Sequence, residues 1–263
     1  MTYKLLATDL DGTLLNDDKK ITDENFRALK YAISRGCKVI PCTGRAVQGV
    51  TKFRQLTKLT PFAITYNGGM IVDLFNNKIV YHCPLQNDDA KFIIQKGNEY
   101  NTNICLWSDN KLYCNKINPY TLDYSKISGV SPIEFKNITE LQGKIITKIL
   151  WYDNEKNIAD YLCKMTDEVA KNVSCCTSKP WFLEFFNSKT SKALALEKLG
   201  EILDITNNEM IAFGDELNDI DMIKYVKTGI AMANAKHPLK ECADYITDNN
   251  NENGFATAVY KLL

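Results

Sequence analysis

Apolar runs alternate with amphipathic stretches along the first part of the chain. Residues 3–8 form a short apolar run without glycine or proline, which is typical of a buried strand. Thr22 stands where an N-cap would begin a helix. The predicted strands are 3–8, CKVIPCT at 37–43 and FAITY at 62–66, and the predicted helices are 22–35 and 46–58. Such alternation predicts an α/β fold, with a parallel sheet and helices on its faces.

The pattern changes in the middle third. Strand-like runs flank Asn76-Asn77 and Asp109-Asn110, two polar dipeptides that favour hairpins. Further strands are predicted at 144–153, 172–177 and 181–186, with a helix at about 155–170. This order predicts an inserted α+β domain, after which strand-helix alternation resumes at about Asn187. The aromatic run PWFLEFF at 180–186 could line a pocket, but its alternation favours a structural core.

Composition excludes several classes of partner. The chain has 263 residues with 32 basic and 32 acidic side chains, so no net charge draws it to nucleic acid or membranes. No apolar stretch approaches the roughly 20 residues of a membrane helix. Charged residues from Lys4 onward replace a signal-peptide core, and nine cysteines lack any C-x-x-C pair. We therefore expect a soluble protein in the reducing cytoplasm.

Carboxylates are the main candidates for chemistry, because the chain has only two histidines. Asp9 and Asp11 follow the first predicted strand, and they would project to one side if the extended backbone continued. Two like charges at about 4 Å repel by about 1 kcal/mol in water and about 4 kcal/mol at an effective dielectric near 20. We therefore expect a positive group there, although DLDG could also be an ordinary turn.

Three further polar groups stand where an α/β fold places function, after a strand or at the start of a helix. They are Thr43 and Gly44 in PCTGR, Lys192 at the start of a helix, and Asp215, Asn218 and Asp219 in GDELND. A turn, a solvated lysine or a helix cap would explain each group separately. Their joint occurrence in this order instead indicates an anion site facing several carboxylates.

These motifs resemble a known superfamily. DLDGTLL, the PCTGR threonine, the lysine of TSKALAL and GDELNDIDM look like the four motifs of the haloacid dehalogenase-like superfamily. The stretch YNGG and the tail GIAMANAKHPLKECADYITDNNNENG are similar to its Cof-type phosphatases. The sequence departs from the family pattern at two places. Ala193 follows the lysine where the family often has glycine, and NGG at 67–69 replaces the commoner NGA. The resemblance implies a Rossmann-like parallel-sheet core at 1–83 and 187–263, with an inserted α+β cap at 84–186 that confers substrate specificity.

The resemblance also implies a reaction. It is that of a Mg²⁺-dependent phosphatase hydrolysing small phosphorylated metabolites, particularly sugar phosphates, through an aspartyl-phosphate intermediate. The implied roles are Asp9 as nucleophile and metal ligand, Asp11 as acid-base and backbone metal ligand, Asp215 as third ligand, Asp219 as a supporting residue, and Thr43, Gly44, Lys192 and Asn218 as phosphate-binding residues.

Two other functions stay open at this stage. A phosphosugar mutase would use the same residues, but it would form isomers and need a bisphosphate activator. A receiver-like signalling module also combines acids, a threonine and a lysine around Mg²⁺, but such a module is about half this length and needs no cap. The sequence indicates a small phosphorylated metabolite as partner, no nucleic acid and no membrane, and it carries no sign of an oligomeric state.

Overall fold

The chain forms two compact units. A computed structural model describes residues 3–263. The first unit contains the chain up to Arg45, Val50–Tyr81 and Ser191–Leu263, and the second contains Ala46–Gly49 and His82–Thr190. Residues 84–186, the range predicted as a cap, fall inside the second unit, and their role in specificity stays a prediction. Across residues 3–263, no helix has both the length and the apolar character needed to cross a membrane.

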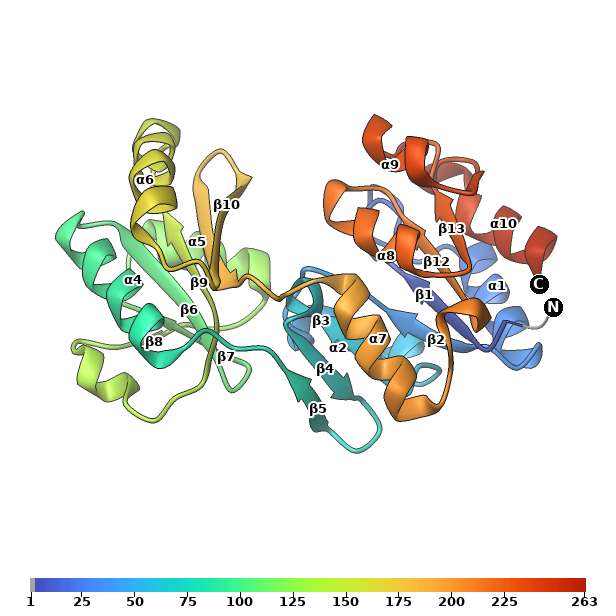
Figure 1. Cartoon of the computed structure of the whole chain (residues 1–263), viewed down its shortest axis with the longest axis horizontal. Coiled ribbons are helices and arrows are strands. Elements are labelled where there is room, and N and C mark those ends of the chain that lie inside the picture. The colour runs from blue at the N-terminus through green and yellow to red at the C-terminus, as the bar shows by residue number, and fades with distance from the viewer. Residues whose placement is uncertain (1–2) are drawn as a thin grey trace. The chain divides into compact units, whose positions relative to one another are not determined.

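A five-stranded parallel sheet lies at the centre of the first unit, in the order β14-β13-β12-β1-β2 (Figure 1). Its strands are β1 (Leu5–Thr8), β2 (Lys38–Pro41), β12 (Met210–Gly214), β13 (Thr228–Ala231) and β14 (Tyr245–Ile246). Every residue of β1 is fully buried, as expected for an apolar strand covered on both faces. The predicted parallel-sheet core is confirmed.

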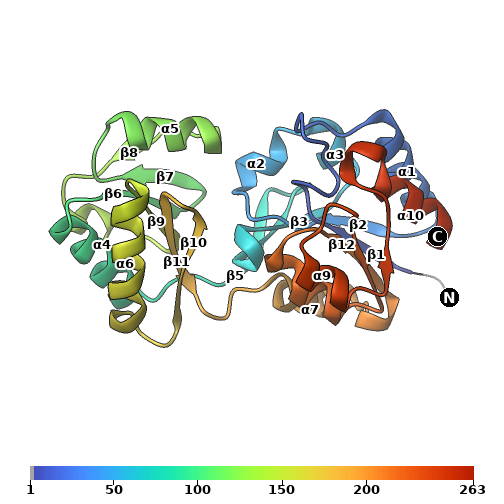
Figure 2. The same cartoon turned by 90° about the horizontal axis from the view of Figure 1, so that it is seen from above.

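Helices cover both faces of this sheet (Figure 2). On one face α1 (Asp23–Ser34) packs against α10 (Gly254–Leu262), and on the other α7 (Lys192–Leu203) packs against α8 (Ile220–Tyr225), which contacts α9 (His237–Cys242). The Thr22 hydroxyl accepts a hydrogen bond from the backbone N–H of Asn25 at 3.1 Å. The predicted N-cap of α1 is therefore confirmed.

Two predictions for residues 46–66 are wrong. The single helix expected at 46–58 is two short helices, α2 (Val47–Thr51) and α3 (Arg54–Thr57). Phe53 separates them because its ψ of 70° lies outside the helical range. The run FAITY forms β3 (Phe62–Thr65), which lies in a separate sheet with β4 (Met70–Asp73) and β5 (Lys78–His82).

The backbone between β3 and β4 explains their antiparallel pairing. Tyr66 and Asn67 both have positive φ, so the chain reverses and β4 pairs antiparallel with β3. An isolated parallel bridge between Cys42 and Ile64 still connects β3 to the chain that follows β2. The run FAITY thus forms the predicted strand, but that strand does not belong to the five-stranded parallel sheet.

The second unit is built on a six-stranded sheet in the order β10-β11-β9-β6-β7-β8. Its strands are β6 (Asn103–Ser108), β7 (Lys111–Cys114), β8 (Ile133–Glu134), β9 (Ile146–Tyr152), β10 (Val173–Lys179) and β11 (Phe182–Asn187), and its helices are α4 (Asn87–Glu99), α5 (Pro119–Ser128) and α6 (Glu155–Glu168). Asp109 and Asn110, both with positive φ, join β6 to β7 as the predicted hairpin.

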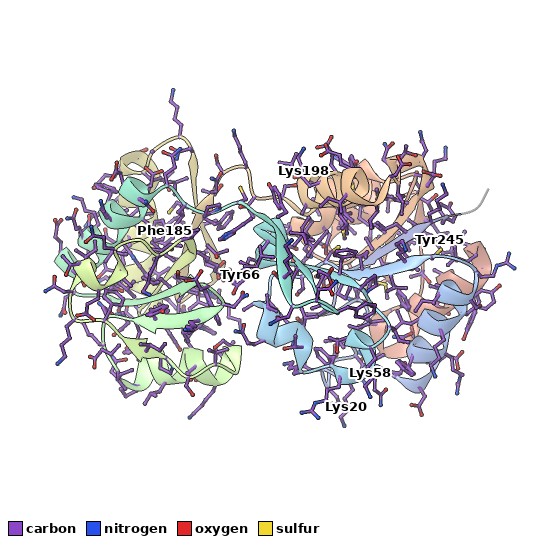
Figure 3. The ribbon with its side chains drawn as sticks, turned by 90° about the horizontal axis from the view of Figure 1, so that it is seen from below. Lys20, Lys58, Tyr66, Phe185, Lys198 and Tyr245 are labelled. Carbon is purple, nitrogen blue, oxygen red and sulfur yellow. The ribbon has the colours of Figure 1, made fainter. Side chains whose placement is uncertain are left out.

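Phe185 packs inside this unit (Figure 3), and its ring centroid lies 4.8 Å from that of Trp151. The structural interpretation of PWFLEFF therefore holds for Phe185.

Candidate active site

A buried lysine joins two carboxylates at the carboxyl edge of the parallel sheet. Asp9 follows β1, and its backbone N–H donates to the carbonyl of Phe213 in β12 at 3.0 Å. Lys192 is the first residue of α7, which the Ser191 side chain caps. Its Nζ lies 2.6 Å from Asp9 Oδ1 and 2.6 Å from Asp219 Oδ1. The side chains of Lys192 and Asp219 are fully buried, so this ion-pair network is shielded from water.

Asp215 brings a third carboxylate to the same place. It follows β12, and its Oδ1 accepts a hydrogen bond from the Thr13 hydroxyl at 2.7 Å. One oxygen from each of Asp9, Asp215 and Asp219 lies within 4.8 Å of the others. Three carboxyl groups and one ammonium share this largely buried cluster, so its formal charge is negative. This charge and the oxygen-only ligand set fit a hard divalent cation such as Mg²⁺.

Asp219 differs from the other two acids because both of its oxygens are engaged. Oδ1 contacts Lys192, and Oδ2 accepts hydrogen bonds from the backbone N–H groups of Asp215 and Glu216, each at 3.1 Å. Among residues 3–263, the second oxygens of Asp9 and Asp215 accept no hydrogen bond. Asp219 therefore holds the lysine and the loop after β12, while the oxygens available to a cation belong to Asp9 and Asp215.

Burial and like charge raise the pKa of two of these carboxyls. Burial raises the pKa of Asp9 well above its usual value, Lys192 opposes this effect, and the other two acids add to it. Burial also raises the pKa of Asp215 to about 7, against the hydrogen bond from Thr13. For Lys192, burial lowers the pKa, but the carboxylates outweigh it and the net direction is upward. The cluster thus carries more negative charge than the lysine neutralises, and a bound cation would favour ionised carboxylates.

Asp11 is paired with different cations. Arg45 Nε lies 2.6 Å from Asp11 Oδ2, Arg45 Nη2 lies 2.6 Å from Oδ1, and Lys19 Nζ lies 3.1 Å from Oδ1. Burial alone would raise the pKa of Asp11, but these partners lower it overall. The expected extended backbone ends at Thr8, so the alternation that would align Asp9 with Asp11 does not apply. A positive group does accompany each acid, but the two acids have separate partners.

Asn67 connects the remaining predicted residues. Its backbone N–H donates to the Thr43 carbonyl at 3.0 Å, and its Oδ1 accepts a hydrogen bond from Asn218 Nδ2 at 2.9 Å. Gly44 lies against the same side chain, since a Cβ at Gly44 would stand 2.7 Å from Asn67 Oδ1. Thr43, Gly44 and Asn218 therefore share one contact network, and their role in phosphate binding stays a prediction.

Comparison with known proteins places the chain in a family. The sequence matches the haloacid dehalogenase-like hydrolase family over residues 6–259. The chain belongs to this family. The 5-amino-6-(5-phospho-D-ribitylamino)uracil phosphatase YcsE of Bacillus subtilis (strain 168) is 35% identical over 258 residues, covering 97% of this chain and 94% of YcsE. YxeH of the same organism is 33% identical over 267 residues, covering 99% of this chain and 98% of YxeH.

Solved structures agree with this assignment. The crystal structure of a haloacid dehalogenase-like hydrolase from Bacteroides thetaiotaomicron has a TM-score of 0.91 and 28% sequence identity, and the match covers 99% of this chain and 100% of that one. The predicted superfamily is therefore confirmed, and so is the prediction of a phosphoric monoester hydrolase.

Three polar side chains of this hydrolase were not predicted from the sequence. They are Thr13, Lys19 and Arg45, which contact Asp215 or Asp11. Thr13 and Arg45 stand inside the motifs DLDGTLL and PCTGR, so their position next to predicted site residues was an available signal. Lys19 lies in a polar stretch, DDKK, and no pattern there distinguishes it from a solvated lysine.

Gly12 leaves space for the Asp215 carboxylate of this hydrolase. Its φ is +83°, and a Cβ there would lie 2.2 Å from Asp215 Oδ2. We expect Gly12→Ala to displace Asp215 and lower turnover about 100-fold, the cost of misplacing an active-site group by about 1 Å. Gly36→Ala is the matched control, because its φ is +91° but a Cβ there meets nothing within 4 Å.

Thermal unfolding and phosphomonoester turnover of both alanine variants test this expectation. Both variants should lose stability, because each forces a side chain into left-handed backbone. Only Gly12→Ala should lose turnover, so similar turnover in the two variants would contradict a steric role for Gly12.

Proposed function

We propose that this chain is a Mg²⁺-dependent phosphatase of small phosphorylated metabolites, sugar phosphates in particular, and that it works through an aspartyl-phosphate on Asp9. The observation that carries the proposal is the cluster of Asp9, Asp215 and Asp219, in which one buried ammonium, that of Lys192, pairs with two of the three carboxyl groups. The name of YcsE adds support, because it specifies a phosphorylated ribityl compound. The nine unpaired cysteines fit the predicted cytoplasmic location.

In the proposed reaction, Asp9 acts as the nucleophile and Asp11 as the general acid and base. Asp9 Oδ2 attacks the phosphorus atom, and the bond from phosphorus to the ester oxygen breaks while Asp11 protonates that oxygen. Asp11 then takes a proton from water, whose oxygen attacks the phosphorus and releases phosphate from Asp9. Lys192 holds the Asp9 carboxylate at 2.6 Å throughout, which orients it and offsets its charge.

Metal and phosphate would share the edge of the sheet. The carboxylates of Asp9 and Asp215 and the backbone carbonyl of Asp11 would hold Mg²⁺, with Asp219 supporting the loop. When bound, Mg²⁺ offsets the repulsion between the attacking carboxylate and the phosphate. Thr43, Gly44, Lys192 and Asn218 would bind the phosphoryl oxygens, and residues 84–186 would act as the cap that selects the leaving group.

Metal dependence tests this function directly. Hydrolysis of p-nitrophenyl phosphate should fall to background in excess EDTA and return when Mg²⁺ is restored, because two buried carboxylates then face phosphate without a cation. Mg²⁺ should also raise the unfolding temperature of the wild type, and Asp215→Asn should reduce that shift. Full turnover in excess EDTA, or an unchanged shift in the variant, would contradict the metal assignment.

A further inference from the structure

Asp11 lies among an excess of cationic side chains. The Arg45 guanidinium engages both Asp11 oxygens, and Lys19 contacts Oδ1. The Asp11 side chain is 37% exposed and that of Lys19 is 55% exposed. Lys19 also interacts with Asp17, whose carboxylate is held by Asn251 and Asn250. Unlike the Lys192 cluster, this group of charges is therefore open to molecules from solution.

Lys52 adds a third cation to the group. The ring of Phe53 has the Arg45 guanidinium carbon 5.4 Å and Lys52 Nζ 5.2 Å from its centroid, so the ring brings the two cations into one neighbourhood. Burial lowers the pKa of Lys52, and repulsion from Arg45 and Lys19 lowers it further. Across residues 3–263, no carboxylate lies within 4.0 Å of Lys52 Nζ. Three cations thus outnumber the two carboxylates, Asp11 and Asp17, even when both are counted.

The pairing of Asp11 with Arg45 cannot persist through the proposed reaction. Both Asp11 oxygens accept hydrogen bonds from the Arg45 guanidinium group, so neither can reach a leaving group while both bonds persist. When Asp11 leaves, Arg45 and Lys19 lose their shared anion beside an already unpaired Lys52. A second anion from the substrate would satisfy all three cations, and a guanidinium group suits carboxylate or phosphate oxygens.

We propose that Lys19, Arg45 and Lys52 form a second anion subsite, which binds a carboxylate or second phosphate on the leaving-group part of the substrate. The proposal deepens the proposed function and rests on it. Asp11 adjoins the subsite and is the proposed proton donor to the leaving group, so the second anion belongs to the leaving alcohol. The substrate class is then a phosphorylated metabolite with two anionic groups. When it binds, its second anion replaces the Asp11 carboxylate at the Arg45 guanidinium group.

Matched substrates that differ in one charge test the subsite. Glycerol 3-phosphate has a neutral leaving group, whereas 3-phosphoglycerate has a carboxylate on it. Glucose 1-phosphate and glucose 1,6-bisphosphate form a second pair, in which the added anion is a phosphate. At low ionic strength, kcat/KM should favour the member with the added anion in at least one pair, and which pair responds identifies the anion. Salt should reduce this preference, because the subsite is partly exposed.

Lys52→Met should reduce the preference about threefold, the effect of a partly exposed charge pair, and leave turnover of the neutral member unchanged. Lys58→Met is the matched control, because Lys58 is an exposed lysine six positions along the chain (Figure 3). Wild-type kcat/KM that is equal within both pairs, or a Lys52→Met variant that keeps the full preference, would overturn the subsite.

A binding measurement separates this proposal from the proposed function. Calorimetry with Asp9→Asn protein and Mg²⁺ needs no turnover, and both compounds of each pair can be titrated. Tighter binding of the doubly anionic compound, weakened by Lys52→Met, would support the subsite even if neither compound is hydrolysed by the wild type. Equal affinities within both pairs would overturn the subsite and leave the phosphatase proposal standing on the metal-dependence experiment.

Discussion

The Asp9→Asn variant should form no covalent intermediate, and its phosphatase activity should fall to background. An amide of the same size removes the proposed nucleophile and leaves Lys192 facing a neutral partner where a carboxylate oxygen lay 2.6 Å away. Loss of a nucleophile of this kind typically removes activity by a factor of about 10⁴ or more. Incubation with p-nitrophenyl phosphate followed by rapid quench and intact-mass measurement should show unmodified protein.

Asp11→Asn is the counterpart that separates the two acids. It keeps the proposed nucleophile, Asp9, and the backbone carbonyl, but it removes the group proposed to activate water, a function worth about 10²- to 10⁴-fold. With an aryl phosphate, whose leaving group needs little protonation, this variant should be phosphorylated and then hydrolyse slowly. The adduct should map to Asp9. An adduct on another residue, or one that forms in Asp9→Asn protein, would show that the nucleophile is assigned wrongly.

Lys192→Met should impair both stability and turnover. The substitution leaves Asp9 and Asp219 buried without the ammonium that contacts both of them. Breaking a buried ion pair from one side typically costs about 3–5 kcal/mol in the free energy of unfolding. Turnover should fall as well, because the lysine offsets charge on Asp9 in the ground state and on the phosphoryl group in the transition state.

Lys198→Met is the matched control on the same helix. Lys198 pairs with Glu201 at the surface, where its side chain is 44% exposed, and Figure 3 shows it on α7. Such a pair contributes about 0–1 kcal/mol, so this variant should unfold and turn over almost as the wild type does. Urea unfolding and steady-state kinetics of the two variants give the comparison. Equal stability and turnover in both would contradict the roles expected of Lys192 in folding and turnover.

Features that depend on neighbouring residues were predictable from the sequence. Thr22 caps α1, and Asp109 with Asn110 forms a tight turn, because each effect involves residues only a few positions apart. The strand-helix order also gave the parallel core, since alternation of this kind leaves few topologies. Phe53 divides the predicted helix at 46–58 with a ψ of 70°, and it is neither glycine nor proline, the residues that usually mark such a break.

In the candidate site, the places of the residues in the fold were predictable from the sequence, but the pairing of their side chains was not. The sequence placed Asp9, Lys192 and Asp215 at strand ends or a helix start, and the parallel sheet brings those positions together. It did not predict that Arg45 would engage Asp11, because rotamers of long side chains depend on contacts distant in sequence. Motif patterns therefore indicated the candidate residues, while the assignment of cations to carboxylates required the structure.

The order of strands in the core sheet also determines when the site can form on the ribosome. β1 is synthesised first but pairs with β12 across Leu5 and Met210, so this pairing waits until most of the chain has been made. Asp9 is synthesised near the start, whereas Lys192 and Asp215 follow the whole of the second unit. A nascent chain that ends before α7 therefore contains Asp9, the proposed nucleophile, without Lys192 or Asp215. A chain that terminates within residues 82–190 lacks Lys192, Asp215 and Asp219, so it cannot assemble the cluster of carboxylates and lysine.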